Sequence, residues 1–430
     1  MASSRRTGIG EQVAAWRELL KTRDFGWLWS GQVISQIGDG LTKIALLWFV
    51  YNLTGSALKM TIIGVLQTIP PLLLGPLAGV YLDRLPKRGA MIVIDLVRAA
   101  LLVIIPLLSM MGWLTLAWLY VVVFVIALFS MAFGPALNAA IPLLVKKDQL
   151  TRANAIMQSS MTIGQLLGPG ISGMLIAVIG AQNVLYVNAA TFLVSALCKI
   201  PIKIRKDTDG RRAGASKQAL FDDLRTGFRF VFVQHRLLLV LMIAAALFTL
   251  GSTGFVYLLP VIGERVLHAD AITLGWLWSA LSVGILATTL WLAFRKQDNL
   301  CRRLWIILGA AVVGGLAVFG LNWTGSLAVA AGLIVVIGGS SGLVTPIVSA
   351  SLQEMTPKDL LARVFSVFNT GTMALAMLGM TVFGWAADRY GPLVSLTSIG
   401  GVLVATAIAT LVMIPSCQRL SKRPRRLSPA

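Results

Sequence analysis

Apolar stretches of about 20 residues recur along the whole chain and are separated by short polar segments. A helix of this length crosses the roughly 30 Å hydrocarbon core of a bilayer and satisfies its own backbone polar groups there. The stretches are too uniformly apolar for barrel strands, whose side chains alternate between lipid and lumen. The pattern predicts an all-α integral membrane protein with twelve transmembrane helices. We place them at 26–51, 58–81, 90–111, 114–140, 154–179, 184–204, 237–262, 273–294, 304–321, 327–352, 364–386 and 392–415.

Charged residues are scarce and lie mainly on one side of these spans. Hydrophobic residues make up 57% of the chain and charged residues 13%, which is about half the charged share of a soluble domain. Of the 37 Lys and Arg residues, 31 fall in the two tails and in alternate loops. The positive-inside rule then predicts that both termini are cytoplasmic. This orientation explains the net charge of +20, so we expect no nucleic-acid partner.

The two halves of the chain resemble each other at an offset of 211 residues. The polar loop 147–152 matches 358–363, and further pairs are Pro135 with Pro346, Gly168 with Gly379, Gly173 with Gly384 and Gly180 with Gly391. Shared apolar composition alone would not align a charged loop and three glycines, so we predict two parallel six-helix repeats with a site between them. The expected domains are a cytoplasmic tail (1–24), a six-helix bundle (25–204), a cytoplasmic linker with an amphipathic helix (205–236), a second six-helix bundle (237–415) and a basic cytoplasmic tail (416–430).

Asp39 and Lys43 are the only ionisable residues that we place deep in a predicted span. Asp39 follows Phe25 by 14 residues, or about 21 Å of helix, which puts it past the bilayer midplane. Ionisable residues inside a membrane are costly and usually functional. We therefore predict that Asp39 and Lys43, with Gln32 and Gln36 on adjoining turns, form the substrate or proton-coupling site.

The alternative is a structural ion pair between Asp39 and Lys43, whose i, i+4 spacing places them on one helix face. Lys43 would also keep the Asp39 carboxylate charged, which opposes a proton-carrying role.

A second charged cluster follows the second predicted helix. It contains Gly75, Gly79, Asp83, Arg84, Lys87 and Arg88, and it is followed by Asp95 and Arg98 in the third helix. The two glycines lie one turn apart and leave room for a neighbouring helix. A carboxylate at Asp83, placed against the N-terminus of the eleventh helix, would hold the cytoplasmic face closed. The alternative is a basic cluster that only sets the orientation of the chain.

Small residues also gather on the fifth predicted helix, where Gly164, Gly168, Pro169 and Gly173 form one face. Small side chains let membrane helices approach closely, so this face predicts a helix-packing interface. A generic packing interface and a functional one are both consistent with this composition.

The glycine four residues before Asp83-Arg84, with the basic pair that follows, resembles the signature of the major facilitator superfamily. The segments YNLTGSALKM, LTRANAIMQ and LLGPGISG resemble its drug:proton antiporter branch, which includes macrolide and siderophore exporters. One departure is Pro86, where the superfamily usually has glycine. The resemblance covers nearly the whole chain. It implies proton-coupled export of amphiphilic small molecules by alternating access in a bacterial inner membrane, with the fifth-helix face packed against the first helix.

Other functions remain open on the same fold, namely a siderophore or lysophospholipid translocator or an uptake carrier. An intramembrane enzyme would need a buried constellation of acid, base, nucleophile or metal, and the sequence has no HExxH or GxSxG context and no histidine within a predicted span. The chain also lacks a GxxxxGK[ST] loop, so ATP is not expected as the direct energy source. We expect no catalytic residues, metal or cofactor. The expected partners are a small-molecule substrate, protons and the lipid bilayer, and the protein is expected to be a monomer.

Overall fold

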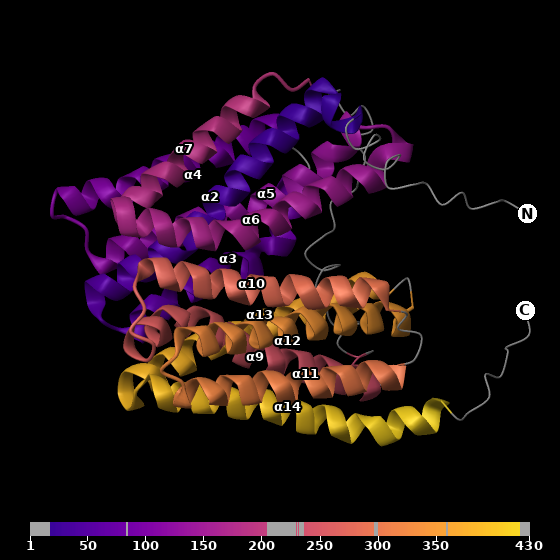
Figure 1. Cartoon of the computed structure of the whole chain (residues 1–430). Helices are drawn as coiled ribbons and strands as arrows, with labels where there is room; N and C mark the ends of the chain where they lie inside the picture. Colours follow the sequence, from indigo (N-terminus) through magenta and orange to yellow (C-terminus); the bar gives the residue numbers. More distant parts are fainter. Residues whose placement is uncertain are drawn as a thin grey trace, which may run out of the picture. The chain divides into compact units, whose positions relative to one another are not determined.

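The computed structural model describes residues 18–82, 85–203, 229, 231, 236–295, 300–357 and 360–421. In these residues twelve helices are long and apolar enough to cross a membrane, as predicted (Figure 1). They are α2 (Arg23–Thr54), α3 (Ala57–Leu82), α4 (Lys87–Met110), α5 (Leu116–Leu144), α6 (Leu150–Ile179), α7 (Ala181–Lys199), α9 (Arg236–Arg265), α10 (Ala271–Phe294), α11 (Leu300–Gly320), α12 (Leu327–Met355), α13 (Leu361–Tyr390) and α14 (Pro392–Ser421). Two short 3₁₀ turns, η1 (Lys147–Gln149) and η3 (Leu321–Trp323), lie between helices.

Most helices run a few residues beyond the predicted spans, but α7 ends at Lys199 and not at residue 204. Pro201 follows two residues later, and a proline has no backbone N–H with which to continue the helical hydrogen bonds. The Arg88 side chain also binds this end of α7, because its Nε donates to the Lys199 carbonyl at 3.1 Å and its Nη2 donates to the Ile200 carbonyl. Cations are favourable at helix C-termini, so Arg88 helps to end α7 here.

The described residues form two compact units. The first contains α2 up to Phe49, α3 from Leu66, and α4 to α7, with α4 packed against both α5 and α7. The second contains Val50–Val65 together with α9 to α14. In the second unit α10 packs against α12, α11 against α14, and α9 against α13 and α14 (Figure 1).

The start of α3 belongs to the second unit because Asp388, near the end of α13, binds it directly. The Asp388 carboxylate accepts hydrogen bonds from Ser56 Oγ at 2.5 Å and from the backbone N–H groups of Ala57 at 2.7 Å and Leu58 at 3.0 Å. The first N–H groups of a helix have no partner inside that helix, and an anion there is favourable. Asp388 therefore caps α3 and joins it to α13.

The internal repeat is visible in the backbone. Gly180 joins α6 to α7 with φ 80°, and its predicted counterpart Gly391 joins α13 to α14 with φ 92°. Both angles lie in the left-handed region that glycine adopts without strain. Pro135 and Pro346 likewise lie inside the matching helices α5 and α12. Equivalent positions of the two halves thus have the same backbone role.

An apolar core in the first unit holds the beginnings of α2, α4 and α6 and the end of α5 together. Phe25, Leu28, Met91, Phe133 and Met157 are all buried in it. This core therefore packs these four helices together at one end of the first unit. Most of the expected tails 1–24 and 416–430, and of the linker 205–236 with its amphipathic helix, lies outside the described residues.

Candidate functional site: a charged cavity in the first unit

The first unit encloses a cavity of about 380 Å³ between α2, α3, α4, α5 and α7. Three charged side chains line it, namely Asp39, Lys43 and Arg98. The other lining residues are Thr42, Leu46, Gln67, Pro71, Leu102, Val123, Ile126, Ala127, Ser130, Met131, Asn188 and Phe192. A mostly apolar wall with a few polar groups is typical of small-molecule sites, and the volume lies within their usual range.

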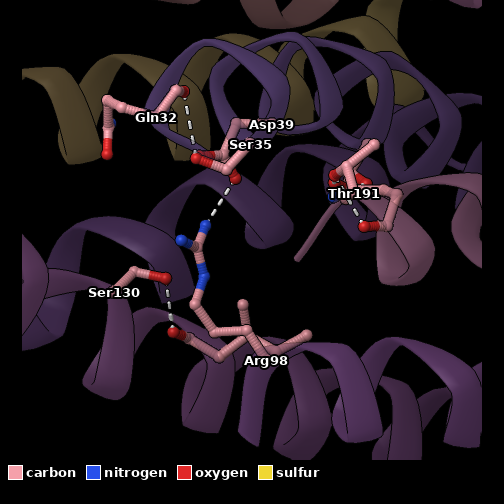
Figure 2. Close-up of polar contacts among 9 residues, drawn as sticks. Gln32, Ser35, Asp39, Arg98, Ser130 and Thr191 are labelled. Atoms are coloured by element: carbon pink, nitrogen blue, oxygen red, sulfur yellow. Dashed lines mark hydrogen bonds and ion pairs between the residues drawn. The ribbon is translucent and has the colours of Figure 1, made fainter. Parts of the chain in front are cut away.

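Asp39 forms an ion pair with Arg98 in this cavity. Figure 2 shows the Arg98 guanidinium pointing at the Asp39 carboxylate, and Arg98 Nη2 donates to Asp39 Oδ1. The Asp39 side chain is 36% exposed and the Arg98 side chain only 9%. The guanidinium also lies 3.9 Å from the centre of the Phe192 ring, where a cation is attracted to the ring face. The carboxylate is therefore the more accessible member of the pair.

This pairing differs from the structural alternative considered from the sequence, which joined Asp39 to Lys43. Lys43 lines the same cavity, but the ion pair of Asp39 is made by Arg98, which the sequence placed with the gating motif. The two residues are 59 positions apart, so no helical periodicity could have joined them. Of the other predicted coupling residues, Gln32 and Gln36 do not line the cavity.

Contacts between α2 and α7 explain why the cavity has this shape. Asn188 Nδ2 donates to Thr42 Oγ1 at 2.5 Å in the interior. A Cβ atom on Gly38 would lie 2.0 Å from Asn188 Oδ1 and 2.2 Å from Thr191 Oγ1, so a larger residue there would force these two side chains to move. This close approach of the two helices places Phe192 of α7 against the Arg98 side chain.

The small-residue face predicted on the fifth transmembrane helix, α6, lies against α2. A Cβ atom on Gly168 would be 2.7 Å from the Gly40 Cα, and one on Gly164 would be 2.9 Å from the Gln36 Cβ. Ser172 Oγ donates to the Leu41 carbonyl across the same contact at 2.8 Å. Gln36 thus belongs to a helix contact and not to the cavity wall. The two remaining residues of the predicted motif, Pro169 and Gly173, are buried as well.

Gln32 lies closer to the start of α2, two turns before Asp39. It is buried, and its amide oxygen has no hydrogen-bond partner among the described residues. Its backbone carbonyl accepts a hydrogen bond from Ser35 Oγ at 3.1 Å (Figure 2). The structure therefore places this predicted coupling residue in the interior, away from the lining of the cavity.

A second ion pair lies deeper in the first unit, and the sequence did not predict it. Lys199 Nζ donates to Asp95 Oδ2 at 2.6 Å, and both side chains are fully buried. Lys199 also donates to Ser195 Oγ and lies 5.0 Å from the centre of the Phe133 ring. Asp95 belonged to the predicted gating motif, whereas Lys199 was missed. A lysine at a span end usually extends to the interface, which hid this signal.

The remaining residues of the gating motif are separated in the structure. Lys87 begins α4, and Arg88 binds the end of α7. Asp83 and Arg84 lie outside the described residues, and Gly79 lies in α3. A Cβ atom on Gly75 would meet no described atom within 4 Å, so no described helix approaches closely at that residue.

The sequence from residue 14 to 429 matches the family described as transmembrane secretion effector. The chain belongs to this family of major facilitator transporters. It is a multi-pass membrane transporter of small molecules. Its family, the twelve spans of the described residues and the charged cavity all support this conclusion. In the described part of the chain, no three His, Cys, Asp or Glu side chains gather in a way that could hold a metal ion.

Two relatives of this transporter are efflux proteins. The chain is 27% identical to the multidrug efflux pump Tap of Mycolicibacterium fortuitum, over 82% of this chain and 87% of the pump. It is 24% identical to macrolide efflux protein A of Streptococcus pyogenes, over 85% of this chain and 90% of that protein.

Solved transporter structures share the fold. A bacterial homologue of the human lysosomal transporter Spinster matches with a TM-score of 0.68 at 15% identity, over 96% of this chain and 99% of that one. The nucleoside transporter NupG matches with a TM-score of 0.70 at 14% identity, over 90% of this chain and 99% of that one. At these identities the likeness concerns the fold alone.

Proposed function

We propose that this transporter exports amphiphilic small molecules in exchange for protons. The observation that carries the proposal is Asp39, an acidic side chain in the middle of α2 that lines a cavity and is held by Arg98. The similarity to the multidrug efflux pump Tap and to macrolide efflux protein A supports drug-type cargo. The mostly apolar cavity wall suits such cargo, because an amphiphile gains from burying its apolar surface.

Exchange follows from competition at the Asp39 carboxylate. The carboxylate binds the Arg98 guanidinium, a proton or a cationic group of the substrate, and each of these excludes the others. A proton that enters from one side therefore releases the substrate, and a substrate that enters from the other side releases the proton. Alternating access of the cavity to the two sides then drives export by the proton gradient.

We infer from the distribution of basic residues that both termini and the segment 205–236 lie in the cytoplasm. The bacterial relatives support a bacterial inner membrane as the site of the protein. We keep the expectation of a functional monomer. We also keep Asp83 as the proposed cytoplasmic gate, on the strength of the sequence motif.

Transport in proteoliposomes tests the proposed function. With an acidic interior, radiolabelled erythromycin should accumulate inside, and a protonophore should abolish the accumulation because no other gradient is present. Asp39→Asn should show no gradient-dependent accumulation. Accumulation only with an alkaline interior would instead indicate a proton-coupled uptake carrier. Transport of a hydroxamate siderophore or a lysophospholipid, but not of erythromycin, would overturn the cargo class.

A further inference from the structure

Two charged residues of α4 each bind a different neighbouring helix. Asp95 and Arg98 are three residues apart, so their side chains share one face of α4. Arg98 pairs with Asp39 of α2 in the cavity, and Asp95 pairs with Lys199 of α7 in the interior. One turn of α4 therefore connects the cavity to the buried ion pair.

Both residues keep unused hydrogen-bonding capacity. Asp95 Oδ1 and Arg98 Nε are buried, and neither has a hydrogen-bond partner among the described residues. A carboxylate accepts several hydrogen bonds, and a guanidinium donates five. A buried acceptor and a buried donor without partners, one turn apart on the same helix, are complementary. Asp95 therefore offers Arg98 a second carboxylate.

We propose that Arg98 exchanges Asp39 for Asp95 when Asp39 is neutralised. A proton or a substrate cation on Asp39 removes the counter-ion of a nearly buried guanidinium, and a buried charge without a partner is strongly unfavourable. Arg98 then turns to Asp95 Oδ1. Lys199 then shares Asp95 with a second cation. The ion pair that joins the end of α7 to α4 is weakened as a result. The exchange rests on the proposed coupling role of Asp39, and it makes Asp95 a positioning residue that acts through Arg98.

The charged surroundings support this exchange. The described ionisable groups around the cluster are Asp39 and Lys43 on α2, Asp95 and Arg98 on α4, and Cys198 and Lys199 on α7. Helix α5 also packs against α4 and carries no charged residue. Asp95 is thus the described carboxylate that remains for Arg98 once Asp39 is neutral. The Phe192 ring lies against the guanidinium, 3.9 Å from its central carbon, and attracts the cation to this place on α4.

A double-mutant cycle on thermal stability tests the exchange without any substrate. The variants are Asp39→Asn, the pair Asp95→Asn with Lys199→Met, and all three changes together. Removing Asp95 with Lys199 leaves the net charge unchanged. Arg98 keeps one carboxylate in the first two proteins and none in the third, so the Tm of the third should fall by more than the sum of the two separate losses. Adding Arg98→Met to the third protein should raise the Tm again and remove this excess loss.

Separate losses of Tm that simply add would overturn the exchange. The matched control is Arg303→Met with Glu354→Gln, which removes a 2.6 Å ion pair of the second unit. Its loss of Tm should add to that of Asp39→Asn, because these sites share no partner.

If the triple variant does not fold even with Arg98→Met, hydrogen exchange at the end of α7 provides a second measurement. After correction for intrinsic rates, this end should exchange faster at acidic than at neutral pH in the unmodified protein. It should exchange fast at both pH values in Asp39→Asn, and equally slowly at both in Arg98→Met. An end of α7 that ignores pH in the unmodified protein overturns the proposal. Neither measurement involves transport, so partner exchange and proton coupling can fail independently.

Discussion

At the scale of single residues, the accessible Asp39 carboxylate has Arg98 as its ion-pair partner. Arg98→Met removes the cation and leaves this acid without its ion-pair partner. Loss of one partner of a buried pair costs about 3–5 kcal/mol, and we expect about 3 kcal/mol because the Asp39 side chain is 36% exposed. Thermal unfolding of the purified protein should show the corresponding fall in Tm. Asp39→Asn together with Arg98→Met should recover most of it.

Transport by the same double variant separates a structural pair from a coupling pair. If Asp39 carries the proton, the double variant is folded but inactive, because the remaining ionisable side chain of the cavity wall is the base Lys43. Erythromycin accumulation with and without a pH gradient, measured at matched protein levels, is the readout. Gradient-dependent transport in the double variant would remove Asp39 from the mechanism.

At the scale of helices, the contact between α2 and α6 depends on glycine at a position where no Cβ fits. We expect Gly168→Ala to destabilise the protein by about 1–3 kcal/mol, as overpacking does, because the new Cβ would lie 2.7 Å from the Gly40 Cα. Gly134→Ala on α5 is the matched control, since its Cβ would meet no described atom within 4 Å. It should be neutral or stabilise the helix by up to about 1 kcal/mol. Equal Tm values for the two variants would show that the contact is loose.

The helices themselves were largely predictable from the sequence, whereas their contacts were not. The length of apolar runs determines which segments span a membrane, so all twelve helices overlap the predicted spans. The pairing of Asp39 with Arg98 depends on how α4 lies against α2, which no local spacing reports. The capping of α3 by Asp388 links residues more than 300 positions apart for the same reason. Ionisable residues within apolar runs of the sequence indicated which helix lines the cavity. Their ion-pair partners are determined by tertiary packing.

At the scale of the whole molecule, the two halves share a backbone plan but differ in charge. Gly180 and Gly391 make the same turn in each half, yet the charged cavity and the buried Asp95–Lys199 pair both lie in the first unit. The described ion pair of the second unit, Arg303 with Glu354, includes an exposed glutamate. Repetition thus explains the fold of the transporter, whereas the charged cavity and the buried ion pair are features of the first unit.

The orientation of the whole chain rests on its 37 basic residues, of which 31 lie on one side of the spans. This asymmetry predicts that residue 216, in the segment between the two bundles, faces the cytoplasm. A cysteine placed there by Ser216→Cys, with the native cysteines replaced by serine, should resist an impermeant maleimide added to intact cells. It should react fully once the cells are opened, which shows that the thiol itself is accessible. A cysteine at Trp323, between α11 and α12, should react in intact cells, because the connection there lies on the opposite side. Labelling of residue 216 but not of residue 323 in intact cells would reverse the orientation, and with it the direction in which the proton gradient drives transport.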